Sequence, residues 1–229
     1  MNNLAIIPAR SGSKGLKDKN IKELGGMPLL AHSVQAALQS GEFSHVMVST
    51  DSAEYARIAE KSGAEVPFMR EAHSASDAAS SWDVVREVLK KYQQMGITFD
   101  TVTLLQPTSP LRTAQDIQKA YSSFREKNAT SVVAVCEMEH SPLWSNTLPE
   151  NLSMDGFLSS ATNRQRQQLS TYYRINGSIY IVDVEHFLAG KDIYGPGSFA
   201  YVMPAERSID IDTALDFLIA ETVLNNLVK

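Results

Sequence analysis

The chain has 229 residues, 43% of them hydrophobic and 21% charged, which is enough for one α/β domain with a substantial core. Its net charge of −5 argues against a nucleic-acid-binding protein, which we would expect to be basic. A single cysteine, Cys136, excludes an intramolecular disulfide and a zinc site built from cysteines. The sequence shows no signal-peptide pattern and no apolar run of about 18 residues, so we expect a cytoplasmic protein without membrane association.

The first predicted strand is followed by a basic, glycine-containing loop. Leu4–Ile7 is a short aliphatic run closed by Pro8, which is typical of a buried strand. Residues 8–20 then contain two glycines, two serines and four basic side chains. Glycines let backbone N–H groups turn toward an anion, so this loop predicts a phosphate site. Its spacing matches neither a Walker A loop nor a dinucleotide-binding fingerprint, and a solvated surface loop is the alternative.

Helices and apolar strands alternate after this loop. The expected helices cover residues 28–41, 52–63, 82–95, 113–128, 184–189 and 213–227. The expected strands cover residues 45–50, 101–105, 131–136, 178–182 and 201–203, with at most a short edge strand at 66–68. Strands this apolar, joined by helices, predict a parallel sheet covered on both faces, in a single domain over 1–229.

Residues 137–174 interrupt the alternation. This span is polar and punctuated by prolines, and it is too long for an ordinary connection within a compact domain. We therefore expect an inserted arm. Its scattered apolar residues need a surface to pack on, which is either another subunit or the chain's own domain.

Two aspartates near the C-terminus form a candidate metal site. Asp210 and Asp212 alternate with Ile209 and Ile211, so on an extended strand both carboxylates point to the same side. Paired carboxylates suit Mg²⁺, which takes one or two protein carboxylates together with phosphates and water. The alternative is that Asp212 caps the following helix.

Several polar residues follow the expected strands or the arm. Arg70, Gln106 and Arg112 lie near the carboxyl ends of strands, where open α/β sheets bind ligands and where arginine can hold phosphate or carboxylate. The prolines around Gln106 also fit a tight structural turn. A second basic group beyond the arm could bind an acidic, polyhydroxylated substrate, and it consists of Arg164, Arg166 and Arg174, with Tyr173, Asn176 and Tyr180 nearby.

Taken together, these motifs resemble those of the acylneuraminate cytidylyltransferases, the CMP-sialic acid synthetases. The matching blocks are 6–15 with Lys19-Asn20, 48–51, 76–81, 104–112, 166–169 with 176–180, and 208–212. They occur in the family's order and span nearly the whole chain. The resemblance implies a Rossmann-like, three-layer nucleotide-diphospho-sugar transferase fold with a mostly parallel mixed sheet. It also implies a homodimer in which 137–174 is a dimerisation arm that reaches into the partner's site.

The implied reaction transfers CMP from CTP to the anomeric hydroxyl of N-acetylneuraminate, with Mg²⁺ as cofactor and pyrophosphate as the second product. By similarity, the CTP-binding residues are Arg10, Ser13, Lys14, Asn20, Arg70 and Ser81. Gln106, Arg166 and Tyr180 match sugar-binding positions, and Asp210 and Asp212 match the metal ligands. Arg10, Lys14 and Asp212 are the implied catalytic residues.

One departure from the family concerns the sugar. After residues 140–143 this chain has Trp144, where some sialate enzymes have a lysine that binds the sugar acid. Legionaminate and other nine-carbon acids therefore remain alternatives. An eight-carbon sugar acid enzyme is disfavoured because it would have Arg-Leu-Pro in place of Gly15-Leu16-Lys17. A non-catalytic nucleotide-binding homologue would be expected to lack the paired aspartates, and a dimeric scaffold leaves the basic loop unexplained.

Overall fold

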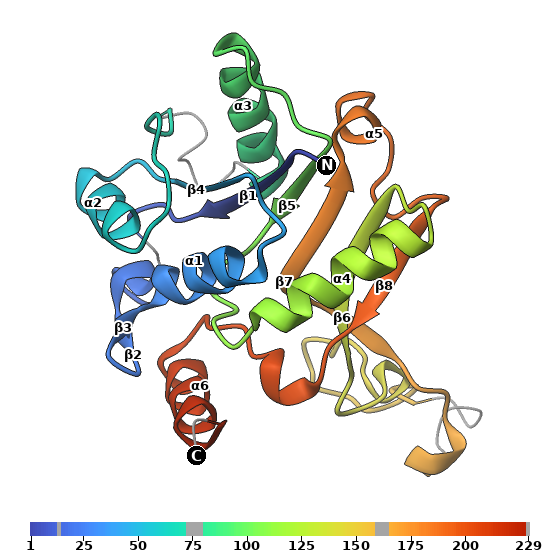
Figure 1. Cartoon of the computed structure of the whole chain (residues 1–229). Coiled ribbons are helices and arrows are strands. Elements are labelled where there is room, and N and C mark those ends of the chain that lie inside the picture. Colours follow the sequence, from blue (N-terminus) through green and yellow to red (C-terminus); the bar gives the residue numbers. More distant parts are fainter. Residues whose placement is uncertain (13–14, 72–79, 159–164, 228–229) are drawn as a thin grey trace.

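A six-stranded mixed sheet forms the centre of the molecule (Figure 1). The computed structural model describes residues 1–12, 15–71, 80–158 and 165–227. In spatial order the strands are β4 His45–Ser49, β1 Asn3–Pro8, β5 Thr101–Leu104, β7 Tyr173–Asp183, β6 Ser131–Glu137 and β8 Ser198–Val202. Only β7 runs antiparallel to its neighbours in this sheet. The predicted mostly parallel mixed sheet is therefore confirmed.

Helices cover both faces of the sheet and make three layers. The helices α1 Leu29–Ser40, α2 Ala53–Lys61 and α4 Ala114–Glu126 pack in one core, while α3 Ser81–Gln94 and α5 Val184–Leu188 pack in the other. Alternation along β1 explains the division. Ala5 and Ile7 enter the first core, and Leu4 and Ile6 enter the second.

Local sequence signals set most of the helix starts. The Ser52 hydroxyl accepts from the backbone N–H of Tyr55, and Thr113 and Asp116 form a capping box, as their spacing predicts. A second capping box starts α3 one residue earlier than expected. In the described chain, residues 66–68 do not form the expected edge strand. Glu65 alone makes an isolated bridge to β4. The proline at 67 accounts for this interruption.

A smaller core joins the C-terminus to the beginning of the chain. The helix α6 Ala214–Leu227 packs near a two-stranded hairpin, β2 Glu23–Leu24 and β3 Met27–Pro28. Leu24, Phe217 and the fully buried Ile211 belong to this core. The last helix thus holds the Asp210–Asp212 segment close to the first loop. None of the helices in the described residues combines the length and apolarity needed to cross a bilayer.

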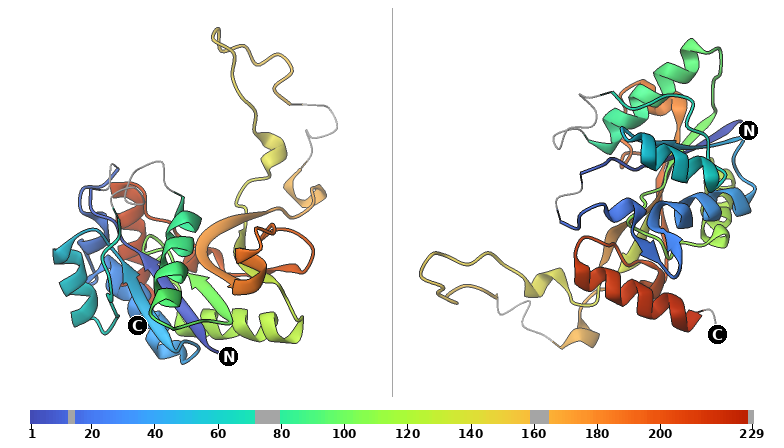
Figure 2. Two further views of the ribbon diagram at one scale, coloured as in Figure 1. Left: turned by 90° about the horizontal axis from the view of Figure 1, so that it is seen from above. Right: turned by 90° about the vertical axis from the view of Figure 1, so that its left-hand side faces the viewer.

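The segment between β6 and β7 leaves the body of the molecule as an extended projection (Figure 2). Within its described parts, regular structure is limited to two 3₁₀ turns, η2 Pro142–Trp144 and η3 Arg166–Gln168. Three of its apolar side chains, Leu148, Leu152 and Met154, are more than half exposed. Among the residues that the structure describes, no element of the chain covers these three side chains.

Candidate functional site

Loops from three neighbouring parallel strands meet at one edge of the sheet. The first loop follows β1, Thr50 and Asp51 follow β4, and Gln106 follows β5. The parallel registers of β1 with β4 and β5 bring these carboxyl ends together (Figure 1). This edge is where open α/β sheets bind ligands, and most of the predicted site residues lie here.

Hydrogen bonds to neighbouring elements fix both ends of the first loop. The backbone nitrogen and hydroxyl of Ser11 donate to the carboxylate of Asp51, at 2.7 and 2.9 Å. At the other end the buried Asn20 amide donates to the Arg10 carbonyl at 3.0 Å. The predicted residues Ser13 and Lys14 lie outside the described residues. Sequence reasoning gave no role to Asp51, although it ends the Val48–Asp51 motif.

Arg70 is buried at the same edge. Its Nε donates to the Ser49 hydroxyl at 3.1 Å, and its Nη2 donates to the Ser49 carbonyl at 2.7 Å. Burial lowers the Arg70 pKa, the Asp51 carboxylate opposes this, and the charge of Arg10 adds to the lowering. Arg10 and Arg70 are thus close enough to sense each other's charge, and together they make this end of the site attractive to anions.

Ser81 is the first residue of α3 and is partly exposed. The N-terminal end of a helix carries partial positive charge and unpaired backbone N–H groups, which favour a nearby anion. Ser80 and Asp83 form the capping box of this helix, so the Ser81 hydroxyl is not its cap. Of the 76–81 motif, only Ser80 and Ser81 lie within the described residues.

The Asp210–Asp212 segment is extended but is not a strand of the sheet. Its backbone is held where Ile211 N donates to the Thr108 carbonyl at 2.8 Å. The alternative in which Asp212 caps α6 is wrong. Thr213 and Asp216 cap that helix, with Thr213 N donating to Asp216 Oδ2 at 2.7 Å and Asp216 N donating to Thr213 Oγ1 at 3.3 Å. The carboxylate of Asp212 is thereby left for another role.

Asp210 presents a buried carboxylate oxygen that lacks a hydrogen-bond partner among the described residues, Oδ1. Burial raises the pKa of Asp210, and the nearby Asp212 carboxylate adds to this, whereas Thr108, Lys19 and Arg174 act in the opposite direction. A partnerless buried oxygen beside a second carboxylate is unfavourable unless a cation joins them. The two residues therefore fit Mg²⁺, whose other ligands would be phosphate oxygens and water.

Lys19 links the first loop to the aspartates. Its buried ammonium lies 3.0 Å from Asp212 Oδ1 and also donates to the Ile211 carbonyl. Gly15 lies against the same segment, because a Cβ there would be 2.7 Å from the Asp212 carbonyl oxygen. The predicted phosphate loop and the predicted metal ligands thus touch directly. Lys19 was missed as a site residue, although the Lys19-Asn20 pair belongs to the first motif.

Arg112 stabilises the Gln106 loop from inside the protein. Its Nη1 donates to the carbonyls of Ser109 and Ser178, both at 3.1 Å, and its Nη2 donates to the Ser33 hydroxyl at 2.6 Å. Burial lowers the Arg112 pKa to about 9, an effect that the Asp116 carboxylate opposes. The expectation that Arg112 could hold a ligand is wrong, since the residue is only 3% exposed and its guanidinium donates to this loop, to α1 and to β7.

The predicted sugar-binding residues come from three different elements. Gln106 lies against Gly177 of β7, where φ is +76° and an added Cβ would be 2.4 Å from Gln106 Oε1. Tyr180 is buried on the α3 side, with its ring edge-to-face to Trp82 at 5.7 Å. Burial raises the Tyr180 pKa to about 12, with smaller contributions from Tyr194 and Asp210. Arg166 begins η3 in the arm, and its side chain lies outside the described part.

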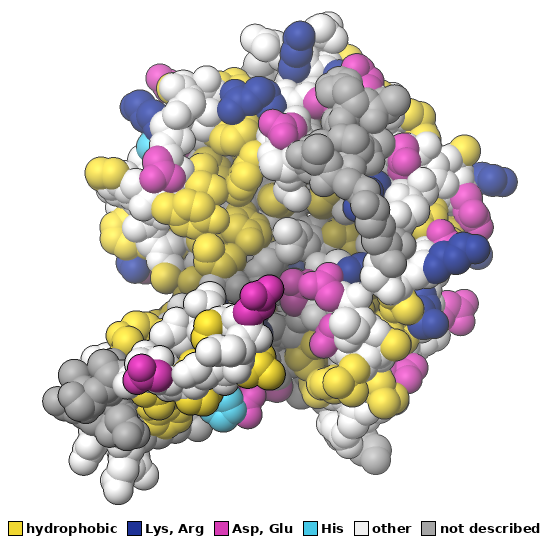
Figure 3. Space-filling view, turned by 180° about the vertical axis from the view of Figure 1, so that it is seen from behind, with side chains coloured by type: hydrophobic (Ala, Val, Ile, Leu, Met, Phe, Trp, Pro, Cys, Tyr) yellow, Lys and Arg dark blue, Asp and Glu magenta, His cyan; other side chains and the backbone are white. Residues whose placement is uncertain are grey.

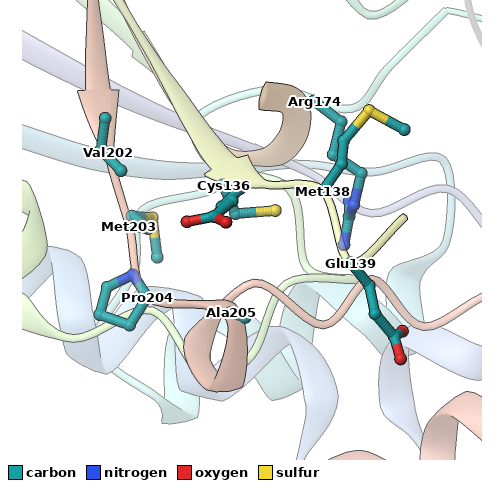
Figure 4. A pocket seen from close by; sticks show the side chains of 9 residues that line it. Cys136, Met138, Glu139, Arg174, Val202, Met203, Pro204 and Ala205 are labelled. Carbon is teal, nitrogen blue, oxygen red and sulfur yellow. The ribbon is translucent and has the colours of Figure 1, made fainter. Parts of the chain in front are cut away.

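A pocket of about 750 Å³ opens where β6 and β8 end (Figure 4). Arg174 lines it and donates from Nη2 to the Ser208 carbonyl at 3.1 Å, which connects the pocket to the aspartate segment. The other lining residues are Cys136, Glu137, Met138, Glu139, Val202, Met203, Pro204 and Ala205. Sequence reasoning identified Arg174 but not this pocket, because its walls come from strands far apart in the sequence.

Comparisons with known proteins agree with this geometry. A family model described as cytidylyltransferase matches residues 4–228. The chain is 37% identical to a CMP-N,N'-diacetyllegionaminic acid synthase from Legionella pneumophila, over 96% of this chain and 95% of the relative. It is 36% identical to an Escherichia coli N-acylneuraminate cytidylyltransferase, over 96% of this chain but 51% of that longer protein.

A solved structure shares the fold. It is a CMP:2-keto-3-deoxy-manno-octonic acid synthetase complexed with CTP, with a TM-score of 0.75, 16% identity, and coverage of 99% of this chain and 100% of the other. At this identity the likeness concerns the fold alone. It confirms the Rossmann-like nucleotidyltransferase architecture that the motifs predict.

The clamp between Ser11 and Asp51 predicts a pH-dependent contribution to stability. Burial acts to raise the Asp51 pKa, but the Ser11 hydrogen bonds and the Arg70 charge outweigh it, so the net shift is downward. The stability that Asp51 contributes is therefore present above its ordinary pKa of about 4 and is lost as the pH falls through the lower folded value. Urea unfolding of wild type and Asp51→Asn should show a difference at neutral pH that shrinks in acid. A difference that grows on acidification would contradict this assignment.

Proposed function

This chain belongs to the cytidylyltransferase family, and on that premise we propose that it transfers CMP from CTP to the anomeric hydroxyl of a nine-carbon sugar acid and releases pyrophosphate. The observation that carries the proposal is the direct contact between the first loop and the aspartate pair. Lys19 and Gly15 join a basic, anion-attracting loop to two carboxylates that fit a divalent cation. A triphosphate with its metal ion would bind to both parts, the phosphates to the basic loop and the metal ion to the aspartates.

In this proposal the first loop and its neighbours hold the nucleotide. Arg10 and Lys14 bind the phosphates and stabilise the charge that develops on the departing pyrophosphate, and Ser13 and Asn20 also bind CTP. Arg70 and Ser81 contact the nucleotide from the next loop and from the start of α3. Two features support this division: the Arg10–Arg70 proximity and the position of Ser81 at a helix N-terminus.

Asp210 and Asp212 would hold Mg²⁺. When bound, the ion would neutralise the phosphate oxygens and lower the pKa of the attacking hydroxyl. The protein's part is to align the sugar hydroxyl in line with the α-phosphorus and to keep the leaving group opposite. Lys19, paired with Asp212, helps to offset the repulsion between the two carboxylates.

Gln106, Tyr180 and Arg166 are the residues that we propose for the sugar acid. The acid is N-acetylneuraminate or a related nine-carbon acid such as legionaminate, and the names of the relatives include N-acylneuraminate, diacetyllegionaminic acid and pseudaminic acid. Trp144 does not decide between them, since both acids carry a carboxylate and an indole cannot pair with it as lysine does. We retain the eight-carbon acid as a weaker alternative, because the octonic acid synthetase shares the fold only. We also infer a cytoplasmic location, where CTP is available.

We further propose that the chain works as a homodimer through the 137–174 arm. The projection exposes Leu148 and Leu152, and the sheet near its root exposes Ile175 of β7 and Val202 of β8. Apolar side chains gather beside the projection on the face seen in Figure 3. Burying such patches against a second copy is favourable, since contiguous exposed apolar surface commonly marks an interface.

The metal role predicts a selective effect of Asp212→Asn. This substitution should reduce pyrophosphate release from CTP and sugar acid by roughly a hundredfold or more, because it removes the negative charge that would bind the metal ion, and the metal ion neutralises the phosphates. Asp100→Asn makes the same chemical change at the opposite edge of the sheet and should leave turnover within about twofold. Release at near-normal rate by a folded Asp212→Asn variant would remove the metal role.

The contact between Gly177 and Gln106 predicts a separation of two substrate affinities. Gly177→Ala should raise the KM for the sugar acid several-fold, with little change for CTP, because the new methyl group displaces the Gln106 amide. Gly190→Ala is the matched control, since its φ is +71° and no atom lies within 4 Å of the added Cβ. Both substitutions should cost about 1 kcal/mol in backbone strain. Equal effects on both KM values in Gly177→Ala would argue against a sugar role for Gln106.

The dimer proposal predicts that charges on the arm dissociate the protein. Sedimentation of the double variant Leu148→Asp/Leu152→Asp should show a monomer at concentrations where wild type is a dimer. Leu38→Asp, on a half-exposed site of α1 away from the arm, is the control and should remain dimeric. A wild-type monomer at all accessible concentrations would overturn this part of the proposal.

A further inference from the structure

We propose that the ion pair between Arg207 and Asp116 positions the two aspartates that would hold Mg²⁺. Arg207 ends η4 Ala205–Arg207, the turn between β8 and the aspartate segment. It lies three residues before Asp210, and it makes no contact with the reacting groups in the proposed mechanism. The inference rests on the proposed function, because it assigns Arg207 a role through the metal ligands and not a direct part in the reaction.

The contact is a two-point ion pair on a buried carboxylate. Arg207 Nε donates to Asp116 Oδ2 at 3.0 Å and its Nη2 donates to Oδ1 at 2.9 Å. Asp116 is 1% exposed, and it also accepts from the Tyr201 hydroxyl of β8 at 3.0 Å and from Thr113 N at 3.0 Å. The Asp116 carboxylate therefore connects the start of α4, the end of β8 and the η4 turn. A planar guanidinium with two parallel bonds fixes direction as well as distance.

The backbone between this ion pair and the aspartates is also fixed. The Ser208 hydroxyl accepts from Asn176 Nδ2 at 2.9 Å and donates to the Pro204 carbonyl at 2.8 Å. Three residues later the backbone of Ile211 is bonded to Thr108. Within the described residues, by contrast, Asp210 Oδ1 has no hydrogen bond of its own. The Asp210 carboxylate also has a hydrogen bond from the Thr108 side chain, and backbone anchors on either side hold the rest of the segment. Arg207 and Arg174, which donates to the Ser208 carbonyl, are charged anchors on the upstream side.

This arrangement gives a role that goes beyond holding the fold together. A small rotation of η4 would move Asp210 relative to Asp212, and Mg²⁺ tolerates little deviation from octahedral geometry. Substitution of a residue that orients a metal ligand without touching the metal typically lowers the metal affinity by ten- to a hundredfold. Arg207→Lys keeps the charge and loses the two-point geometry, so it tests orientation with the charge kept constant.

The test compares two arginine–carboxylate ion pairs that involve opposite ends of α4. Arg207→Lys loosens the ion pair at the start of α4. Arg125→Lys loosens another two-point pair at its far end, where Arg125 binds Glu42 at 2.7 and 3.1 Å. Mn²⁺ binding in the presence of CTP is measured by electron paramagnetic resonance, together with turnover at varied Mg²⁺ and the thermal unfolding midpoint. Asp116→Asn, which keeps the volume and can still cap α4, provides a second variant should Arg207→Lys fail to fold.

We expect Arg207→Lys and Asp116→Asn to weaken Mn²⁺ binding by roughly tenfold, and to raise the Mg²⁺ concentration for half-maximal turnover to match. Arg125→Lys should leave both within about twofold. The inference is overturned by wild-type Mn²⁺ affinity in a folded Arg207 or Asp116 variant, or by an equal loss in Arg125→Lys. Wild-type protein that binds no Mn²⁺ with CTP would instead refute the proposed metal role itself, and this inference with it.

Discussion

The site depends on an electrostatic imbalance at the carboxyl edge of the sheet. The partly buried carboxylate of Asp210, with its buried Oδ1, lies beside that of Asp212, and only part of this negative charge is offset by Lys19. Packing of Ile211 into the core holds the segment in place between the two aspartates, although the Asp212 side chain is itself 75% exposed. In the proposed function, a cation that binds there would offset the cost of placing Asp210 Oδ1 away from water.

The fold supplies the rest of the site by bringing loop ends together. Parallel strands place the first loop, Asp51 and Gln106 at one edge, and the smaller core around α6 returns the C-terminal aspartates to that edge. Lys19 of the first loop then pairs with Asp212 near the C-terminus, and Gly15 lies against the Asp212 backbone. The proposed nucleotide end of the site lies within the body of the chain, whereas Arg166 and Trp144 belong to the projecting arm.

Sequence patterns predicted features that are set locally. The period of apolar residues gave the sheet and its covering helices, and the spacing of Thr113 and Asp116 gave a helix cap that the structure confirms. Long-range polar pairing could not be read in this way. The sequence pattern does not show that Lys19 pairs with Asp212, because the two residues are far apart in the chain. It also does not show that Arg112 is buried while Arg10 is not, because charge alone does not indicate burial. The motif resemblance included Asp51 in one of its blocks but assigned no role to it.

The most direct measurement follows the α-phosphate. CTP labelled at that position is incubated with the protein, Mg²⁺ and a panel of eight- and nine-carbon sugar acids, with ATP, GTP and UTP as controls. The account predicts that the label moves into a CMP ester of a nine-carbon acid, with one pyrophosphate released for each ester and no transfer from the other nucleotides. Label that stays in CTP with every acid, or that appears as free CMP without an ester, would contradict it.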